Sequence, residues 1–257
     1  MAAGQDYEET NATLRSLYEE RMRRAERRHW EQPAEFSLGD GVAPLRLSAM
    51  PGRFLGAQAW LSGELLARHL AAGGCSAFPG GSAPRCLELG AGIGIVGLAV
   101  AAAGFAGEMI LTDKAEMQPL LSHNVQINGL AGTCRAEQLD WGSAPPSSWS
   151  TIDVVLAADV IYPTKDPSDL FALRETLFAL CPRGSTTTLV LAYHERAKED
   201  RQFLDRDLLP HFKILSQEVV SGTSSTMHSA APSGQPGFSD AAKSHSCQVF
   251  ICQRNSC

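Results

Sequence analysis

The sequence predicts an α/β protein with a doubly wound, mostly parallel sheet of seven strands that ends in an antiparallel hairpin. Short apolar runs alternate with helix-like segments from about residue 85 to residue 209, and two further apolar runs follow without a helix between them. Strands joined by crossover helices lie parallel, whereas two adjacent closing strands without a crossover helix pair antiparallel. The order of the elements therefore gives the fold class.

Each element has its own local signal. Glu35 to Ser48 alternates apolar and polar residues around Gly39-Asp-Gly41, which predicts a hairpin, and Gln58 to Ala71 carries apolar residues at helical spacing. Helices are then expected at 93–103, 115–128, 167–180 and 197–209. Strands are expected at 85–89, 108–112, 133–138, 152–158, 186–193, 212–220 and 247–253.

Two segments lie outside this alternation. Residues 1–34 are predicted to form an N-terminal helical extension, with an Arg- and Glu-rich helix over 8–31 whose charges are most simply a solvated face. Residues 35–257 are predicted to form one domain. Within it, residues 221–246 are rich in Ser, Gly, Ala and Pro, which predicts a flexible loop insertion.

Composition narrows the class of protein. The 257 residues carry a formal net charge of −6, which disfavours a protein that coats nucleic acid. No apolar run approaches the roughly 20 residues of a membrane span, and the first residues lack the layout of a signal peptide. The seven cysteines form no C-x-x-C pair, and Cys247, Cys252 and Cys257 lack histidines at metal spacing. We expect reduced thiols, no metal site, and a location in the cytosol or nucleus.

The most informative segment is a glycine-rich turn after the first parallel strand, Arg85-Cys-Leu-Glu-Leu-Gly-Ala-Gly-Ile-Gly-Ile-Val-Gly-Leu-Ala99. Gly90, Gly92 and Gly94 have no side chain to keep a ligand from the backbone amides. The helix that follows adds a partial positive charge at the same place. Such a turn holds a nucleotide-like ligand at the carboxyl edge of a sheet. The alternative is a tight turn without a ligand.

Two acids near the turn distinguish between ligands. Gly92 to Gly97 also fits the dinucleotide pattern G-x-G-x-x-G, which is a weak signal on its own. Glu88 places a carboxylate ahead of the glycines, where it can face an amine or a cation. Asp113 ends the next apolar run, where it can accept both hydroxyls of a ribose. S-adenosylmethionine carries an amine and a sulfonium and no pyrophosphate, so the pattern favours it over NAD.

Four further motifs resemble those of methyltransferase family 16, a group of class I S-adenosylmethionine-dependent methyltransferases. They are Gly56-Ala-Gln-Ala-Trp60-Leu-Ser62-Gly63, Asn124-Val-Gln-Ile-Asn128, Leu139-Asp-Trp141-Gly and Ala158-Asp159-Val-Ile-Tyr162. The resemblance runs from about residue 36 to residue 253. It implies the seven-stranded fold, S-adenosylmethionine as the cofactor, and transfer of methyl groups to a lysine side chain of a protein.

The same resemblance assigns the site. The cofactor-binding residues would be Trp60, Glu88, Gly90, Gly92, Asp113, Trp141 and Ala158. Trp141 would stack on the adenine and Trp60 would close over the cofactor, although either tryptophan could instead pack in the core. Asp159 and Tyr162 would be catalytic: Asp159 would accept N–H bonds from the incoming amine, and Tyr162 would form the channel wall.

Four further residues are expected to have no contact with the cofactor. Asn124 and Asn128 lie on one helix face and are expected to bond to backbone groups. Tyr193 and His194 end a strand on the ligand-facing edge, so either could line the substrate channel.

Other functions stay open at this point. The acceptor could be arginine, histidine or a non-protein molecule, since the motifs constrain the cofactor more than the acceptor. The protein could also be an inactive adaptor that binds the cofactor, a nucleic-acid methyltransferase or an NAD-dependent oxidoreductase. The leading prediction is a monomeric protein-lysine methyltransferase whose partner is a protein substrate, with neither nucleic acid nor membrane.

Overall fold

The computed structural model describes residues 30, 32–73, 83–149, 151–162, 166, 168–222 and 245–256. Apart from Trp30, the helix expected over 8–31 lies outside the described residues. So does the loop expected over 221–246, apart from two residues at each end.

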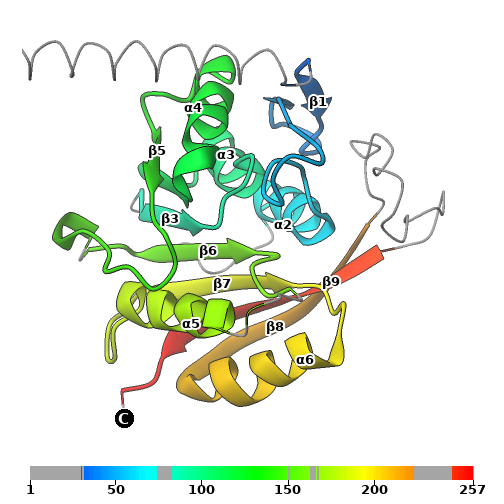
Figure 1. Ribbon diagram of the computed structural model, residues 1–257. Coiled ribbons are helices and arrows are strands. Elements are labelled where there is room, and N and C mark those ends of the chain that lie inside the picture. The colour runs from blue at the N-terminus through cyan, green and yellow to red at the C-terminus, as the bar shows by residue number, and fades with distance from the viewer. Residues whose placement is uncertain are drawn as a thin grey trace, which may run out of the picture.

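A seven-stranded sheet forms the centre of the molecule (Figure 1), with the strand order β5-β4-β3-β6-β7-β9-β8. The first five strands in this order run parallel to one another, while β9 is antiparallel to both β7 and β8. This order confirms the predicted fold class. The strands are β3 (Arg85–Leu89), β4 (Glu108–Asp113), β5 (Cys134–Gln138), β6 (Val154–Ala158), β7 (Thr188–Tyr193), β8 (Phe212–Gly222) and β9 (His245–Arg254).

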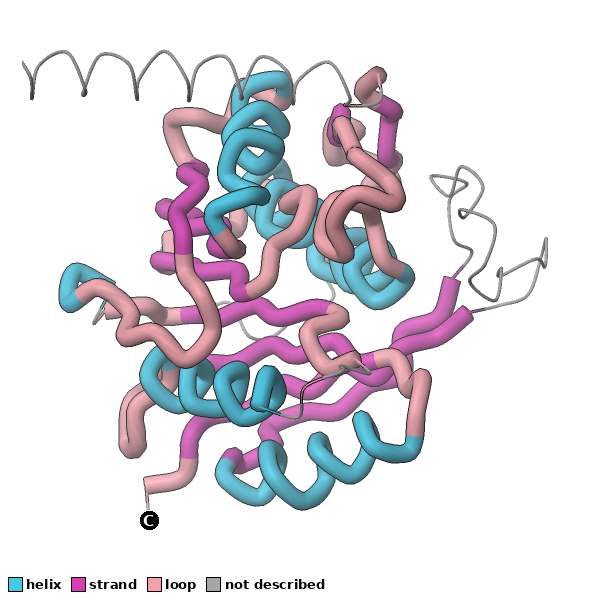
Figure 2. Tube along the Cα trace, viewed as in Figure 1, coloured by secondary structure: helices cyan, strands magenta, loops and turns pink. Residues whose placement is uncertain are grey.

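Helices cover both faces of this sheet (Figures 1 and 2). One face carries α2 (Leu61–Ala71), α3 (Ile95–Ala102) and α4 (Gln118–Ile127). The other carries α5 (Ser168–Leu180) and α6 (Lys198–Gln202), which continues as a π-helical segment, Phe203–Leu208. No helix in the described ranges has both the length and the apolarity needed to cross a bilayer.

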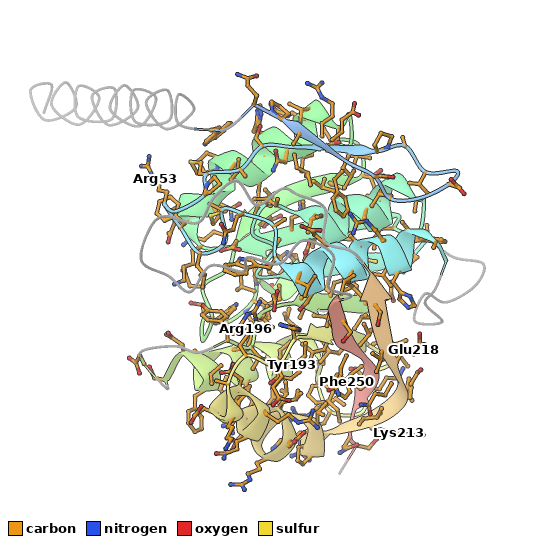
Figure 3. All side chains as sticks on the ribbon, turned by 90° about the vertical axis from the view of Figure 1, so that its right-hand side faces the viewer. Arg53, Tyr193, Arg196, Lys213, Glu218 and Phe250 are labelled. Atoms are coloured by element: carbon orange, nitrogen blue, oxygen red, sulfur yellow. The ribbon has the colours of Figure 1, made fainter. Side chains whose placement is uncertain are left out.

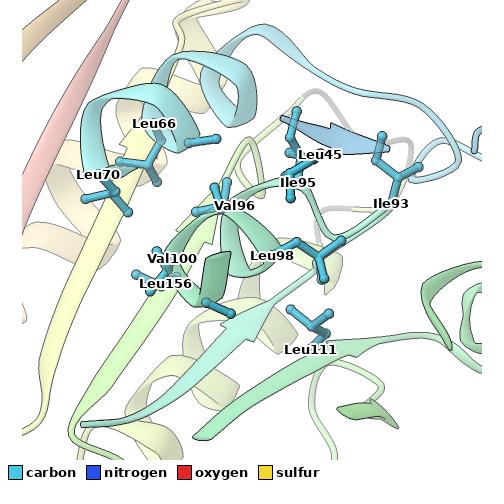
Figure 4. Close-up of a cluster of buried hydrophobic side chains, with 14 of the residues drawn as sticks. Leu45, Leu66, Leu70, Ile93, Ile95, Val96, Leu98, Val100, Leu111 and Leu156 are labelled. Atoms are coloured by element: carbon cyan, nitrogen blue, oxygen red, sulfur yellow. The ribbon is translucent and has the colours of Figure 1, made fainter. Parts of the chain in front are cut away.

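Alternation along the strands divides the core into two layers. In β6, Val154 and Leu156 pack with α2, α3 and α4, whereas Val155 and Ala157 pack with α5. Figure 4 shows the first layer, where Val96 and Val100 of α3 lie between α2 and the sheet. Burial on both faces explains why these strands read as continuous apolar runs.

Several boundaries differ from the sequence prediction. Trp60 has an extended backbone (φ −113°, ψ 152°), so α2 begins at Leu61 and not at Gln58. Both strands of the closing hairpin are longer than expected, reaching Gly222 and starting at His245. The N-terminal hairpin is confirmed: β1 (Ala34–Phe36) pairs antiparallel with β2 (Leu45–Leu47).

Asn124 of α4 and Asn128, which follows the last residue of α4, join this hairpin to the domain. The buried Asn124 side chain accepts a 2.9 Å bond from the Ser48 amide and donates to the carbonyls of Ser48 (3.1 Å) and Ile93 (2.9 Å). Asn128 accepts from the Arg46 amide and donates to the Arg46 carbonyl, both at 2.7 Å. The expectation that both side chains bond to backbone is confirmed.

Candidate active site

The glycine turn lies at the carboxyl edge of β3. Gly90, Gly92 and Gly94 have φ values of 66°, 58° and 85°, in the left-handed region that favours glycine. Gly56 packs directly on the turn, since a Cβ atom at Gly92 would lie 2.6 Å from the Gly56 carbonyl oxygen. The first glycine of the Gly56–Gly63 motif therefore covers the second glycine of the turn.

Asp113 ends β4, which is the parallel neighbour of β3. Its Oδ2 accepts a 2.8 Å bond from the Gly92 amide, and its Oδ1 accepts one of 2.8 Å from the Lys114 amide. Burial raises the pKa of this carboxyl, and the two amide donors partly offset that effect. A carboxylate can accept about four hydrogen bonds, so both oxygens keep capacity for ligand hydroxyls.

Glu88 is placed differently from Asp113. Its side chain is 2% exposed, and its Oε2 accepts a 2.8 Å bond from the Gly97 amide in α3. Burial raises the pKa of Glu88 to about 8 despite this donor. The carboxylate is thus directed beneath the first turn of α3 and not at an open surface, because Glu88 shares the α3-facing side of the strand with Cys86. It supports the turn, and its contact with a ligand stays a prediction.

Two aromatic residues gather beside the turn. The rings of Trp141 and Tyr162 lie 6.3 Å apart at 47°, and both side chains are partly buried. A Cβ atom at Gly90 would lie 3.4 Å from Trp141 Cζ2 and 3.0 Å from Val160 Cγ1. Burial raises the pKa of Tyr162, with further contributions from the carboxylates of Asp169 and Asp113. The Gly90 backbone, Trp141 and Tyr162 therefore line one region near the end of β3.

Asp159 follows Ala158, the partly buried last residue of β6. Among the described residues it is the one non-glycine with positive φ, at 59°, a conformation that costs about 1–3 kcal/mol. Its side chain is 5% exposed. Oδ1 accepts a 2.6 Å bond from Nη1 of Arg196, and Oδ2 lies 3.4 Å from the Ser62 amide in the first turn of α2.

Arg196 is a site residue that the sequence did not reveal. It follows β7 by three residues, at the same carboxyl edge, and its guanidinium lies 5.3 Å from the centre of the Trp60 ring. Trp60 is itself held by a 2.8 Å bond from Nε1 to the Leu55 carbonyl. The available signal was a basic residue just past a strand end. At this strand end the sequence predicts only Tyr193 and His194 as channel residues.

Of those two residues, Tyr193 does not line a channel. It is 2% exposed and packs in the layer under α5, and burial raises its pKa to about 12. Its position in the strand puts it on the same side as Leu191, which faces that layer. Figure 3 shows Tyr193 and Arg196 close together in projection near the middle of the view. His194 Nδ1 lies 2.9 Å from the Ser246 carbonyl, which ties the loop to β9.

These residues fit a nucleoside with a short amino-acid tail. The left-handed glycines expose backbone without side chains, Asp113 offers carboxylate oxygens one strand away, and Trp141 offers an aromatic face. No pyrophosphate-binding group is needed for such a ligand. The edge of β3, β4 and β6 thus has the donors, acceptors and stacking surface that S-adenosylmethionine requires.

Comparison with known proteins gives the family. Residues 43–207 match the family model described as "Lysine methyltransferase". The chain is 31% identical over 182 residues to mouse protein N-lysine methyltransferase METTL21A, covering 66% of this chain and 75% of that protein. It is 32% identical over 161 residues to mouse EEF1A lysine methyltransferase 3, covering 60% and 66%. A shorter match, 31% over 109 residues, reaches Xenopus laevis histone-arginine methyltransferase METTL23 and covers 40% and 45%. The chain therefore belongs to the lysine methyltransferase family and is an S-adenosylmethionine-dependent methyltransferase.

Proposed function

We propose that this protein methylates a lysine side chain of a protein substrate at the carboxyl edge of β3, β4 and β6. The observation that carries the proposal is the convergence of three features on this edge. They are the glycine turn with Asp113, the pair Trp141 and Tyr162, and the buried carboxylate of Asp159. The matches to relatives named as lysine methyltransferases support the choice of acceptor.

The cofactor-binding part of the proposal rests on the glycine turn. Gly90 and Gly92 bring bare backbone to the ligand, Asp113 accepts the ribose hydroxyls, and Trp141 stacks on the adenine. Glu88 keeps the turn in place through its bond to the Gly97 amide. When bound, the cofactor supplies an electrophilic methyl group on its sulfonium sulfur.

The acceptor part centres on Asp159 and Tyr162. A lysine ammonium has a pKa near 10.4, so releasing its proton at pH 7 costs about 4.6 kcal/mol. In our proposal Asp159 holds the acceptor nitrogen by accepting its N–H bonds, and Tyr162 forms the wall that fixes its direction. The proton leaves to water before attack. Positioning of the nitrogen in line with the methyl group then supplies most of the rate enhancement.

Incubation of the purified protein with radiolabelled cofactor and a cell extract tests the proposal. A protein band should become labelled, and Asp159→Ala should abolish the label while Asp205→Ala, on the α6 side of the sheet, should retain it. Labelling that persists in Asp159→Ala would contradict the proposed role of Asp159 in holding the acceptor nitrogen. Tight binding of cofactor without transfer to any protein would instead favour an inactive adaptor.

Mass spectrometry of the labelled peptide decides the acceptor type. We expect methyl-lysine, and a protein of the EEF1A kind is the first candidate substrate because of the match to EEF1A lysine methyltransferase 3. Arginine is the second candidate because of the match to METTL23. We further propose a monomer that acts in the cytosol or nucleus, which size-exclusion chromatography and microscopy of a fluorescent fusion would check.

A further inference from the structure

We infer that Arg196 offsets the negative charge of Asp159 and thereby lets the acceptor lysine react as a neutral amine near neutral pH. Arg196 is in this view a positioning residue that acts through Asp159. The inference rests on the proposed function, because it takes Asp159 as the group that receives the acceptor nitrogen.

The ion pair is close and sheltered. Nη1 of Arg196 lies 2.6 Å from Oδ1 of Asp159, and the two side chains are 19% and 5% exposed. A charge-assisted bond of this length, away from bulk water, is stronger than the same pair at the surface. Among the described residues, no other basic side chain lies within ion-pair distance of Asp159. One guanidinium therefore compensates this carboxylate.

Contacts with other elements fix both residues of the ion pair. The Asp159 backbone is fixed in the left-handed region, and its second oxygen faces the Ser62 amide in α2. The Arg196 guanidinium lies over the Trp60 ring, whose indole is bonded to the Leu55 carbonyl. A cation over an aromatic face gains further stabilisation. The geometry thus keeps the guanidinium on the carboxylate.

This arrangement meets a requirement of the chemistry. A carboxylate next to a lysine favours the ammonium form, which has no lone pair and cannot attack the methyl group. A permanent positive charge on the same carboxylate opposes that effect, and arginine keeps its charge at all relevant pH values. At an effective dielectric constant of about 20, one charge some 6 Å from the acceptor shifts its titration by about one to two pH units.

Other titratable groups around the pair are mostly acidic. Glu195 and His194 share the loop of Arg196, and His194 is bonded to the Ser246 carbonyl. From α6, Asp200 is 1% exposed, and Arg196 partly offsets the pKa rise that burial causes there. Glu64 of α2 is buried with Arg68 3.8 Å away. The remaining groups are Tyr162 beyond β6, Tyr193 of β7 and Cys247 of β9. Burial and the charge of Asp159 raise the pKa of Cys247 to about 12. Burial raises the pKa of this thiol and of both phenols, so these three groups carry no charge near neutral pH, and Arg196 acts mainly on the Asp159 carboxylate.

The test is the pH profile of methyl transfer. Initial rates of labelling of the substrate band are measured with saturating radiolabelled S-adenosylmethionine from about pH 6.5 to about pH 9.5. The variants are Arg196→Gln, Arg196→Lys and the matched control Arg201→Gln, which loses an ion pair of the same 2.6 Å length to Asp205. Cofactor binding of each variant is followed by thermal shift with S-adenosylhomocysteine.

For Arg196→Gln we expect the midpoint of the profile to move up by about one unit or more, with a roughly tenfold lower rate at neutral pH that recovers at high pH. Arg196→Lys and Arg201→Gln should keep the wild-type midpoint. A uniform loss of rate without a shifted midpoint in Arg196→Gln would overturn the inference. If Arg196→Gln fails to fold, a raised midpoint in Arg196→Lys would overturn it as well. A wild-type protein that labels no band contradicts the proposed function instead.

Discussion

The Glu88 carboxylate accepts a 2.8 Å hydrogen bond from the Gly97 amide, so an acid buried in β3 holds the first turn of α3. The contact is tight, since a Cβ atom at Gly97 would lie 2.7 Å from Glu88 Oε2. With 2% of the side chain exposed, the charged form is poorly solvated and the pKa rises to about 8. The acid of the glycine motif is therefore part of the turn's support.

Replacing Glu88 should change how stability depends on pH. The folded-state pKa of about 8 lies above the ordinary value of 4.5, so the folded protein retains a proton that the unfolded chain has lost. Stability from this group is complete below about pH 4.5 and declines as the pH rises towards 8, by on the order of a few kcal/mol.

Glu88→Gln should remove that decline, which urea unfolding at several pH values measures. Glu175→Gln, at an exposed position on α5, is the control and should leave it in place. An unchanged pH dependence in Glu88→Gln would contradict the raised pKa.

Gly92→Ala should disrupt the turn. The new Cβ would lie 2.6 Å from the Gly56 carbonyl oxygen, and φ at this position is 58°. Clash and backbone strain together should destabilise the fold by more than about 2 kcal/mol and abolish cofactor binding. Gly129→Ala is a matched control, because its φ is 69° but nothing lies within 4 Å of the added atom. It should cost about 1 kcal/mol. Equal losses in the two variants would show that the contact with Gly56 is unimportant.

Asp113→Ala should weaken the binding of the cofactor more than it destabilises the fold. The substitution removes the acceptor of the Gly92 amide and the oxygens proposed for the ribose. We expect about a tenfold to hundredfold loss of affinity for S-adenosylhomocysteine by calorimetry, equivalent to about 1.4 to 2.8 kcal/mol. Asp205→Ala, on the α6 side of the sheet, should bind nearly as the wild type does. Undiminished affinity in Asp113→Ala would remove this residue from the cofactor site.

Asn124→Ala should lower stability strongly. The variant leaves the Ser48 amide and the carbonyls of Ser48 and Ile93 without their side-chain partner in a buried setting. Unsatisfied buried groups cost about 1–3 kcal/mol each, so a loss of about 2–4 kcal/mol in chemical unfolding is expected. Asn128→Ala removes bonds to Arg46 at a more exposed position and should cost less. The reverse order would contradict the role of Asn124 as the main link to the hairpin.

The local residue pattern was enough to predict most of the helices and strands, but not all of their boundaries. The expected helix 58–71 begins only at Leu61, because Trp60 adopts an extended backbone at the cap. The expected helix 197–209 passes from α6 into a π-helical segment. Propensity does not fix such details, since neighbouring elements decide how a helix starts and winds.

The sequence by itself determined the order of strands and helices, the glycine turn and the acids at the strand ends. These depend on residue type at short spacing, and they sufficed to predict the fold and the cofactor. The tertiary structure decided which side chains meet. It joined Arg196 to Asp159 across 37 positions, buried Tyr193 in the second layer and turned Glu88 beneath α3. Such contacts depend on the pairing of distant strands and on which face each residue occupies, and no local pattern specifies either.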